Sequence, residues 1–425
     1  MTASRGRGDI DLASLEFWER PLAARADALR HLREHEPIAF FEEPPSPLPM
    51  FPQGPGFFAL TRYADIVEAS KRPDLFCSGE GTTIRDQPQP VRELFGSIVN
   101  LDDPRHARMR RIVAHGFTPK ALERLVGQLG RQAREVVDDI ADKGEIDFVE
   151  EVAAPLPLRV ILDMMGIPRS EESFVLERSN IMAGSSDPEY VDQGDPMGVV
   201  TAVLGAANDM LQLVGSLAEH RRANPQDDLI TSLVNANVDG ESLTTEEIAS
   251  FFILLVAAGN ETTRTALAHA MLELSQHDDQ RALLLQDVDG MLPTAVEEIV
   301  RYSSPVIHFR RTVTQDGVRL GDHTFKTGDK VVLYYGAANR DPGVFADPDR
   351  FDITRHPNPH IGYGGPGPHF CLGAHLARRE ITAMLRELFT RLPDMRVTGE
   401  PERLRSDFVN GIKHLTVTFT PEGTR

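Results

Sequence analysis

A capping box opens the longest helix that the sequence predicts. Thr244 and Glu247 have the Thr-x-x-Glu spacing that starts many helices, and helical periodicity then continues to about His277. At about 1.5 Å per residue, such a helix spans the whole molecule. Its centre is apolar nearly all round, so we expect that centre to be buried. Because residues 105–290 are mostly helical in pattern, the sequence predicts a mainly α fold, a large helical bundle with this helix at its centre.

A smaller β-rich portion accompanies the predicted bundle. Residues 57–61 and 306–335 have strand-like composition, and glycines punctuate the second segment. Residues 44–56 and 336–370 are rich in proline and are expected to be loops. Neither a linker nor an internal repeat is visible, so we expect one domain over residues 1–425.

Charge and cysteine content narrow the classes of function. The chain of 425 residues has a formal net charge of −19, which argues against a nucleic-acid partner because no basic excess neutralises phosphates. Cys77 and Cys371 are the only cysteines, so a disulfide framework is excluded and a reducing cytoplasm is expected. The N-terminus lacks a signal-peptide pattern, and the longest apolar run, residues 251–258, is too short for a transmembrane segment.

A glycine- and proline-rich loop, residues 362–373, carries one thiol directly before a predicted helix over residues 374–392. The positive end of that helix favours the thiolate form of Cys371. Gly367 and Gly373 lack Cβ, so we expect unusual φ angles and the close approach of a flat, bulky group. A thiolate presented in this way is a metal ligand or a nucleophile.

A polar step interrupts the centre of the long helix at residues 257–263. Gly259 weakens the helix there, and the hydroxyl of Thr262 can bond to the preceding turn. Burial of Glu261 costs free energy unless the carboxylate finds a partner. The segment is either an exposed turn or a local opening that binds a small molecule, with an acid and an alcohol placed to pass protons.

These features together resemble the cytochrome P450 superfamily. Two further motifs of that family follow in the expected order, the pair Glu298 and Arg301 in a Glu-x-x-Arg pattern and a meander over residues 338–351. Four motifs in order are a specific signal, whereas Glu-x-x-Arg alone is common in helices. The resemblance extends from Tyr63 to His414.

The cysteine loop departs from the usual family pattern. Gly364 stands where a phenylalanine is usual, and the aromatic residue, Tyr363, comes one position earlier. This shifted pattern resembles bacterial enzymes that act on sterols and on methyl-branched lipids, above all those that hydroxylate terminal methyl groups. The segments that carry this similarity are residues 101–106, 116–120, 251–256 and 410–413.

The resemblance implies that Cys371 is the axial thiolate ligand of haem b iron. Buried propionates need cations, which the resemblance assigns to two histidines and two arginines. The residues expected to contact the haem are His106, Arg110, Ala258, Arg311, Gly364, His369 and Gly373. Arg310 is the rival of its neighbour Arg311 for one propionate.

The resemblance also separates catalytic from supporting residues. Thr262 is expected to hydrogen-bond to bound dioxygen, and Glu261 to relay protons through water. Glu298, Arg301 and Arg350 are expected to form a buried carboxylate–guanidinium triad that supports the fold.

Electrons have to come from outside the chain, because no Gly-x-Gly-x-x-Gly motif follows a strand. A ferredoxin and a ferredoxin reductase that uses NAD(P)H are therefore implied. Arg378 and Arg379 could attract an acidic ferredoxin, although both can equally be ordinary surface charges.

Hydroxylation of an unactivated C–H bond needs a dry cavity that holds the substrate by shape. The expected walls are Ile98, Val99, Leu255, Ala258, Val306, Ile307, Phe408 and Val409. We expect a long, methyl-branched hydrophobic chain, an isoprenoid or a sterol side chain that enters tail first and is hydroxylated at its terminal (omega) carbon. Its polar head is expected near Arg85, Asp86 or His308.

Other functions remain open at this point. The same chemistry could act on a different terpenoid or steroid, and a haem sensor, carrier or peroxide-using protein would keep the haem without this activity. A zinc site made of His369, Cys371 and His375 has plausible spacing but gives Glu261 and Thr262 no role. A lipid-binding protein without chemistry is the remaining alternative.

Overall fold

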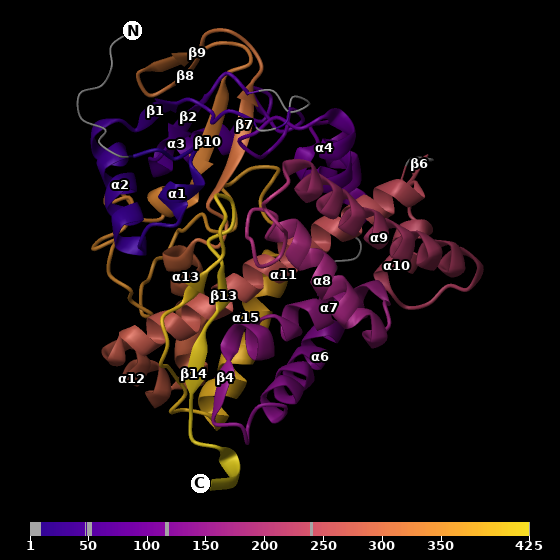
Figure 1. Ribbon diagram of the computed structural model, residues 1–425, viewed down its shortest axis with the longest axis vertical. Helices are drawn as coiled ribbons and strands as arrows, with labels where there is room; N and C mark the ends of the chain where they lie inside the picture. The colour runs from indigo at the N-terminus through magenta and orange to yellow at the C-terminus, as the bar shows by residue number, and fades with distance from the viewer. Residues whose placement is uncertain (1–9, 47, 49–52, 115–118, 239–240, 425) are drawn as a thin grey trace.

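The computed structural model describes residues 10–424 apart from 47, 49–52, 115–118 and 239–240. Part of one segment that supports the resemblance, residues 116–118, lies outside the described residues. The described chain is mainly helical, as the sequence predicts. Its β-rich portion lies at the top of Figure 1, near the N-terminus.

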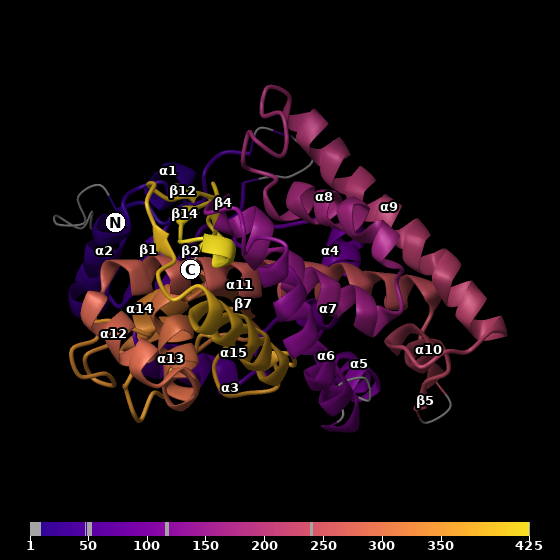
Figure 2. The ribbon, with the colours of Figure 1, turned by 90° about the horizontal axis from the view of Figure 1, so that it is seen from below.

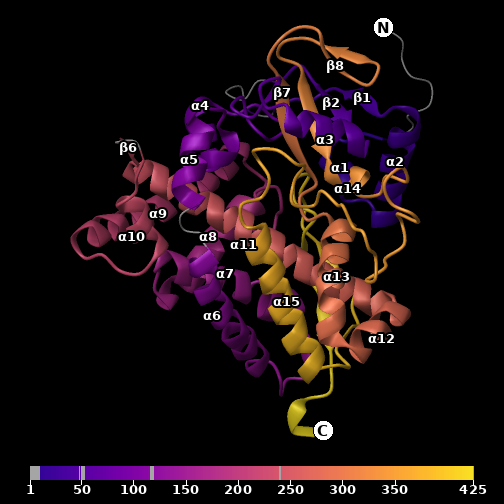
Figure 3. The same cartoon turned by 180° about the vertical axis from the view of Figure 1, so that it is seen from behind.

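Helix α11 (Thr245–Gln276) runs through the middle of the molecule. Its capping box is present, because the Thr244 hydroxyl accepts from the Glu247 N–H and the Glu247 carboxylate accepts from the Thr244 N–H. It packs against α7 (Pro155–Met165), α9 (Pro196–Ala223), α13 (Val288–Ser303) and α15 (Ala374–Arg391). Figure 3 shows α13 and α15 on the side opposite to that seen in Figure 1. The expectation of a buried central helix is confirmed.

The other helices complete the bundle or flank the sheet. Figure 2 shows α8 and α9 beside one part of α11, whereas α12 lies near the opposite end of α11. The remaining α-helices are α1 Leu15–Trp18, α2 Leu22–His35, α3 Tyr63–Lys71, α4 Gln89–Gly96, α5 Arg105–Ala114, α6 Pro119–Asp138, α8 Glu172–Ala183, α10 Leu229–Val234, α12 Asp278–Gln286 and α14 Tyr335–Ala338.

In the described part of the chain, the largest sheet has the strand order β1-β2-β10-β7-β3. Strands β2 and β10 run parallel, and the other neighbours are antiparallel. These strands are β1 Ile38–Phe41, β2 Phe57–Leu60, β3 Phe76–Cys77, β7 His308–Val313 and β10 Lys330–Tyr334. Strand β10 is buried along its whole length because it lies in the middle of the sheet. Its neighbour β7 carries Arg310 and Arg311, which pair with Val332 and Val331 of β10.

Short strands pair elsewhere at the surface. One sheet has the order β11-β14-β4, with β4 Glu145–Asp147, β11 Arg396–Val397 and β14 Thr416–Thr418. The two-stranded pairs are β5 Asn237–Val238 with β6 Glu241–Ser242, β8 Val318–Leu320 with β9 His323–Phe325, and β12 Glu402–Arg403 with β13 Ile412–His414.

Among the described residues, one helix, α9, is long and apolar enough to cross a membrane when judged by length and composition alone. Small and polar residues interrupt the sequence of α9, so it contains no long continuous apolar run. Helix α9 packs against α8, α10 and α11, and its length and composition alone are weak evidence for a membrane span.

Candidate active site

One cavity, with a volume of about 250 Å³, gathers most of the side chains that the sequence singles out. Its lining comes from α5, α11, α15, β7 and the loop before α15. The residues expected to contact a haem all lie there: His106, Arg110, Ala258, Arg311, Gly364, His369, Cys371 and Gly373. Thr262 lines the same cavity.

The loop before α15 presents Cys371 through backbone geometry. The Cys371 N–H donates to the carbonyl of Tyr363 at 3.0 Å. Gly367 has a φ of +153°, and a Cβ there would lie 2.2 Å from the carbonyl oxygen of Ser70, so only glycine fits. Gly373 differs from the expectation because its φ of −84° is ordinary, although the space beside it is open.

The Cys371 thiol is reached through the cavity although protein atoms surround it. Burial raises the pKa of this thiol, while the Gly373 N–H and the charges of Arg110 and Arg378 act in the opposite direction. The helix end favours the thiolate as expected, but desolvation is the larger effect and raises the pKa overall. A bound metal cation reverses the balance, because coordination deprotonates a thiol.

Helix α11 continues through the polar step without an exposed turn. The Thr262 hydroxyl donates to the carbonyl of Ala258 at 2.6 Å and lies in the cavity. Glu261 is 2% exposed and forms an ion pair with Arg264, which donates to Asn180 at 2.9 Å. Glu261 does not line the cavity, so the acid and the alcohol that follow one another in sequence face different surroundings.

Two neighbouring arginines of β7 point to opposite faces of the sheet, as alternate residues of a strand do. Arg311 lines the cavity and donates to the carbonyl of Arg310 at 2.7 Å. Arg310 forms an ion pair with Asp86 at 2.6 Å and donates to the Glu80 carbonyl. Of the two rivals, Arg311 is the one that reaches the cavity.

Two imidazoles lie beside these cations. The rings of His106 and His369 are 4.2 Å apart, and the Nε2 atom of His106 is buried without a hydrogen-bond partner in the described chain. Burial and the charge of Arg311 lower the pKa of His369 to about 2. Arg110 donates to the carbonyl of Phe370 at 2.8 Å. The cavity thus offers cations and an unfilled hydrogen-bonding position close to one thiol.

The cytochrome P450 family profile matches residues 58–393, which is well over half of the chain. The chain belongs to the cytochrome P450 family. It is a monooxygenase, and the family's cofactor is a thiolate-ligated haem. The predicted family, mainly α fold and enzyme class are confirmed.

Curated relatives and solved structures support this assignment over nearly the whole P450 chain. The methyl-branched lipid omega-hydroxylase of Mycobacterium tuberculosis is 48% identical and covers 97% of this chain and 95% of its own length. A steroid C26-monooxygenase of Mycolicibacterium smegmatis is 38% identical, with coverages of 93% and 91%. A Mycobacterium marinum cytochrome P450 in complex with pseudoionone has a TM-score of 0.90 at 38% identity, and the match covers 98% of this chain and 100% of that one.

The residues of this P450 cavity fit a haem. Cys371 offers a thiol, Gly373 leaves open space beside it, and Arg110, Arg311 and the orphaned Nε2 of His106 are suited to carboxylates.

Replacement of Arg311 by glutamine is expected to weaken haem retention roughly tenfold or more, because a hydrogen bond to a charged group contributes about 1.5–3 kcal/mol. Haem transfer to apomyoglobin measures the loss rate. Arg310→Gln is the matched control, since it removes the neighbouring charge and the Asp86 ion pair but faces away from the cavity. Equal haem loss in both variants would contradict this assignment.

Five of the eight expected substrate contacts line the cavity: Ile98, Val99, Leu255, Ala258 and Val306. Ile307, Phe408 and Val409 do not line it. Ile307 follows Val306 on an extended segment and therefore faces the other side, where it lines a second pocket. Val409 pairs with Val306 through backbone, and Phe408 packs against His308 and Phe309.

Several further apolar residues of the P450 cavity were not predicted from the sequence, namely Ile161, Met164, Phe251, Leu254, Phe309 and Tyr335. Ile161 and Met164 come from α7, which carries no family motif, so only its packing against α11 reveals them. The expected head-group contacts also lie elsewhere. His308 is 1% exposed and bonded to the Asp407 carbonyl, Asp86 pairs with Lys330 and Arg310, and Arg85 is exposed outside the cavity.

The buried triad has a different third member. Arg301 donates to both oxygens of Glu298 at 2.7 Å, and both side chains are 0% exposed. Arg355 supplies the other guanidinium, with Nε 3.2 Å from a Glu298 oxygen. Arg350 contributes only its carbonyl, which accepts from Arg301 and Arg355. The expected role of Arg350 is therefore wrong: the residue is exposed, and Arg355 makes the contact with Glu298.

Glu380 of α15 is a cavity residue that the sequence did not reveal. Burial raises its pKa to about 8, although a hydrogen bond with Thr263 partly opposes this shift. Because the folded-state pKa of Glu380 lies above its ordinary value of 4.5, the group's contribution to stability is fully present below about pH 4.5. This contribution is lost as the pH rises through about 8.

Glu380→Gln is therefore expected to flatten the pH dependence of stability between about pH 5 and pH 8, with a gain of several kcal/mol relative to the native residue at the upper end. Urea unfolding of the haem-loaded enzyme across that range measures it. Parallel stability profiles for the two proteins would show that Glu380 is ionised throughout.

The zinc alternative finds no support in the described residues. Groups of potential ligands there surround His414, with Asp147 and Glu150 or with Glu189 and Glu402. His369, Cys371 and His375 do not form such a group, and His375 is exposed.

Proposed function

We propose that this P450 hydroxylates the terminal methyl group of a methyl-branched lipid, an isoprenoid or a sterol side chain. The observation that carries the proposal is the cavity itself, in which Cys371 and basic side chains meet an apolar wall from α7 and α11. The 48% identity with a methyl-branched lipid omega-hydroxylase favours the branched lipid over the steroid, whose C26-monooxygenase relative is 38% identical.

Residues of the cavity would hold the haem that this reaction needs. Bound haem supplies a thiolate-ligated iron that favours O–O cleavage. Cys371 would hold the iron, and Arg110, Arg311 and the imidazoles of His106 and His369 would hold the propionates. The overall reaction consumes the substrate C–H bond, O₂, two electrons and two protons, and it yields an alcohol and water.

Proton delivery involves Thr262 and Glu261. The hydroxyl of Thr262 keeps a proton at Oγ1 inside the cavity, and the small side chain of Ala258 leaves room beside it. Glu261 is buried beside Arg264, and its Oε1 atom has no hydrogen-bond partner in the described chain. For Glu261 to relay a proton into the cavity, its carboxylate must leave Arg264 and rotate toward water.

The electron donor belongs to the proposal as well. We propose a ferredoxin reduced by an NAD(P)H-dependent reductase, which docks near Cys371, where Arg378 and Arg379 add positive charge. Arg378 already pairs with Glu297, so Arg379, which is exposed, is the freer of the two. A cytoplasmic location and a single domain over residues 1–425 complete the proposal; both cysteines are free, which suits a reducing compartment.

The test compares a methyl-branched fatty acid with its straight-chain isomer and with a sterol ketone that has an intact side chain. We expect the haem-loaded enzyme, supplied with the ferredoxin pair and NADPH, to bind the branched acid tightest and to hydroxylate its terminal carbon. Mass spectrometry of the products locates the hydroxyl group. Internal hydroxylation, or preference for the straight-chain acid, would contradict the proposal, and preference for the sterol would favour the steroid alternative.

A further inference from the structure

A second pocket, with a volume of about 490 Å³, lies on the other side of the β7 segment from the haem cavity. Helix α2 contributes Leu22, Arg25, Ala26, Leu29 and Arg33, which recur at helical spacing and so share one face. Helices α11 and α13 and strand β10 supply the opposite walls. Neighbouring residues separate the two cavities: Val306 lines the first and Ile307 the second.

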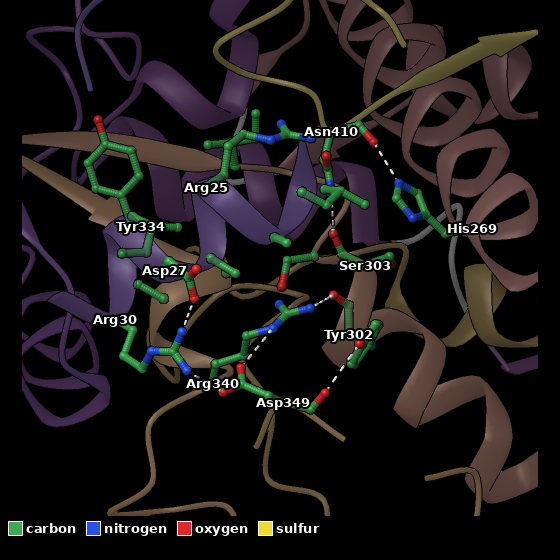
Figure 4. A pocket seen from close by; sticks show the side chains of 18 of the residues that line it. Arg25, Asp27, Arg30, His269, Tyr302, Ser303, Tyr334, Arg340, Asp349 and Asn410 are labelled. Atoms are coloured by element: carbon green, nitrogen blue, oxygen red, sulfur yellow. Dashed lines mark hydrogen bonds and ion pairs between the residues drawn. The ribbon is translucent and has the colours of Figure 1, made fainter. Parts of the chain in front are cut away.

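Arg25 is the unusual group in this second pocket. It is 6% exposed, and its Nε and Nη2 atoms have no hydrogen-bond partner in the described chain. Figure 4 shows it at the same end of the pocket as His269 and Asn410. A buried guanidinium without a counter-charge is costly, because desolvation of its charge is not offset.

The charges around Arg25 do not neutralise it. Arg403 repels it, and burial together with this repulsion lowers the pKa of Arg25 to about 10, so it stays cationic at neutral pH. Burial lowers the pKa of His269 to about 3, which leaves that ring neutral. Among the described residues, no carboxylate acts on the pKa of Arg25. Because two of its nitrogens are also unpaired, this end of the pocket has an uncompensated positive charge.

The other arginines of the pocket have carboxylates close to them. Arg30 pairs with Asp27 and Asp349 at the outer rim, and Arg340 lies 3.7 Å from Asp349 (Figure 4). Arg33 donates to the carbonyl of Ala337 at 2.9 Å and leaves its Nε unpaired, but Asp341, Asp349 and Glu34 act to keep it charged. The unmatched charge is thus confined to the Arg25 end.

Apolar side chains extend from Arg25 along the pocket, namely Trp18, Leu22, Leu29, Ile307 and Ala337. Trp18 is stacked on Tyr334 at 5.8 Å between ring centroids. A volume near 490 Å³ falls in the range of small-molecule sites. A single planar guanidinium suits a carboxylate, and the acidic groups at the rim disfavour a dianion such as phosphate.

We propose that this second pocket binds an amphipathic organic carboxylate, with its carboxylate on Arg25 and its apolar chain along α2. The site is distinct from the haem cavity and does not depend on the identity of the hydroxylated substrate. Its occupant neutralises Arg25 and covers the aromatic and aliphatic wall.

Equilibrium dialysis of labelled octanoate against the haem-loaded enzyme tests this site, with an azole inhibitor saturating the haem cavity. We expect one equivalent of octanoate to bind while the Soret band of the azole complex stays unchanged. Acetate and octanol are each expected to compete at least about tenfold more weakly, because each lacks one half of the ligand. Competition by acetate or octanol at the strength of octanoate, or the absence of octanoate binding, would overturn the proposal.

Variants locate the site. Arg25→Gln is expected to weaken octanoate binding at least about tenfold, whereas Arg30→Gln, on the same helix but paired at the rim, leaves it unchanged. Ala26→Phe fills the pocket from a half-buried position and is expected to abolish binding even if Arg25→Gln fails to fold. Native affinity in the folded Ala26→Phe protein would place octanoate elsewhere and overturn the proposal.

Discussion

Replacement of Cys371 by serine is expected to abolish the red-shifted Soret band of the reduced, carbon monoxide-bound enzyme and to bring hydroxylation below detection. Serine keeps the shape of the side chain, but its hydroxyl does not ionise near neutral pH and cannot serve as a thiolate ligand. The loop geometry should survive, because it depends on the Cys371 N–H bond to the Tyr363 carbonyl and on Gly367, which the substitution leaves intact. The difference spectrum and product formation are the two measurements.

Cys77→Ser is the matched control for that substitution. Cys77 lies on β3, outside the haem cavity, and burial raises its pKa, which disfavours the thiolate form that binds iron. The control protein should keep both the red-shifted band and the activity. A Cys371→Ser protein that binds haem and retains the red-shifted band would refute the assignment of Cys371 as the ligand.

Loss of the Glu298 carboxylate is expected to cost about 3–5 kcal/mol of stability, because it leaves Arg301 and Arg355 charged and unpaired in the interior. Glu298→Gln keeps the size of the side chain, removes the charge and replaces one acceptor oxygen by an NH2 donor. The three donors that now share the carboxylate, Arg301, Arg355 and the Asp352 N–H at 2.9 Å, are then left with one oxygen, so the segment around Asp352 loosens together with α13. Urea unfolding followed by circular dichroism and by haem absorbance measures the loss.

Asp289→Asn on the same helix serves as its control. Asp289 pairs with Arg386 at the surface, where the two side chains are 75% and 50% exposed, so its removal should cost less than about 1 kcal/mol. Similar destabilisation in the two variants would mean that the buried ion pairs of Glu298 are no more stabilising than a surface pair.

Backbone features that depend on local sequence were predictable. The capping box of Thr244 and Glu247, the length of α11 and the position of α15 after Cys371 all follow from neighbouring residues. Side-chain direction in irregular segments was not predictable in the same way. Arg350 and Arg355 lie in one loop, and only its folded course brings Arg355 to Glu298.

The acid–alcohol pair shows the same limit within a regular helix. Sequence placed Glu261 and Thr262 together, but adjacent residues of a helix point about 100° apart, so only Thr262 enters the cavity. The partner of Glu261, Arg264, was already visible at three residues' distance. Glu261 either pairs with Arg264 or relays a proton into the cavity. Which of the two occurs depends on the residues that pack against the Glu261 side of α11.

The sequence by itself determined the family, the helical bundle and the thiol at the start of α15, because ordered motifs and helix signals are local properties of the chain. Only the tertiary structure decided that Arg311 rather than Arg310 faces the haem cavity and that Ile307 lines the second pocket. It also decided that burial outweighs the helix end in setting the pKa of Cys371. The direction in which a side chain points and the desolvation of a titratable group depend on packing between segments far apart in sequence. No local sequence pattern encodes that packing.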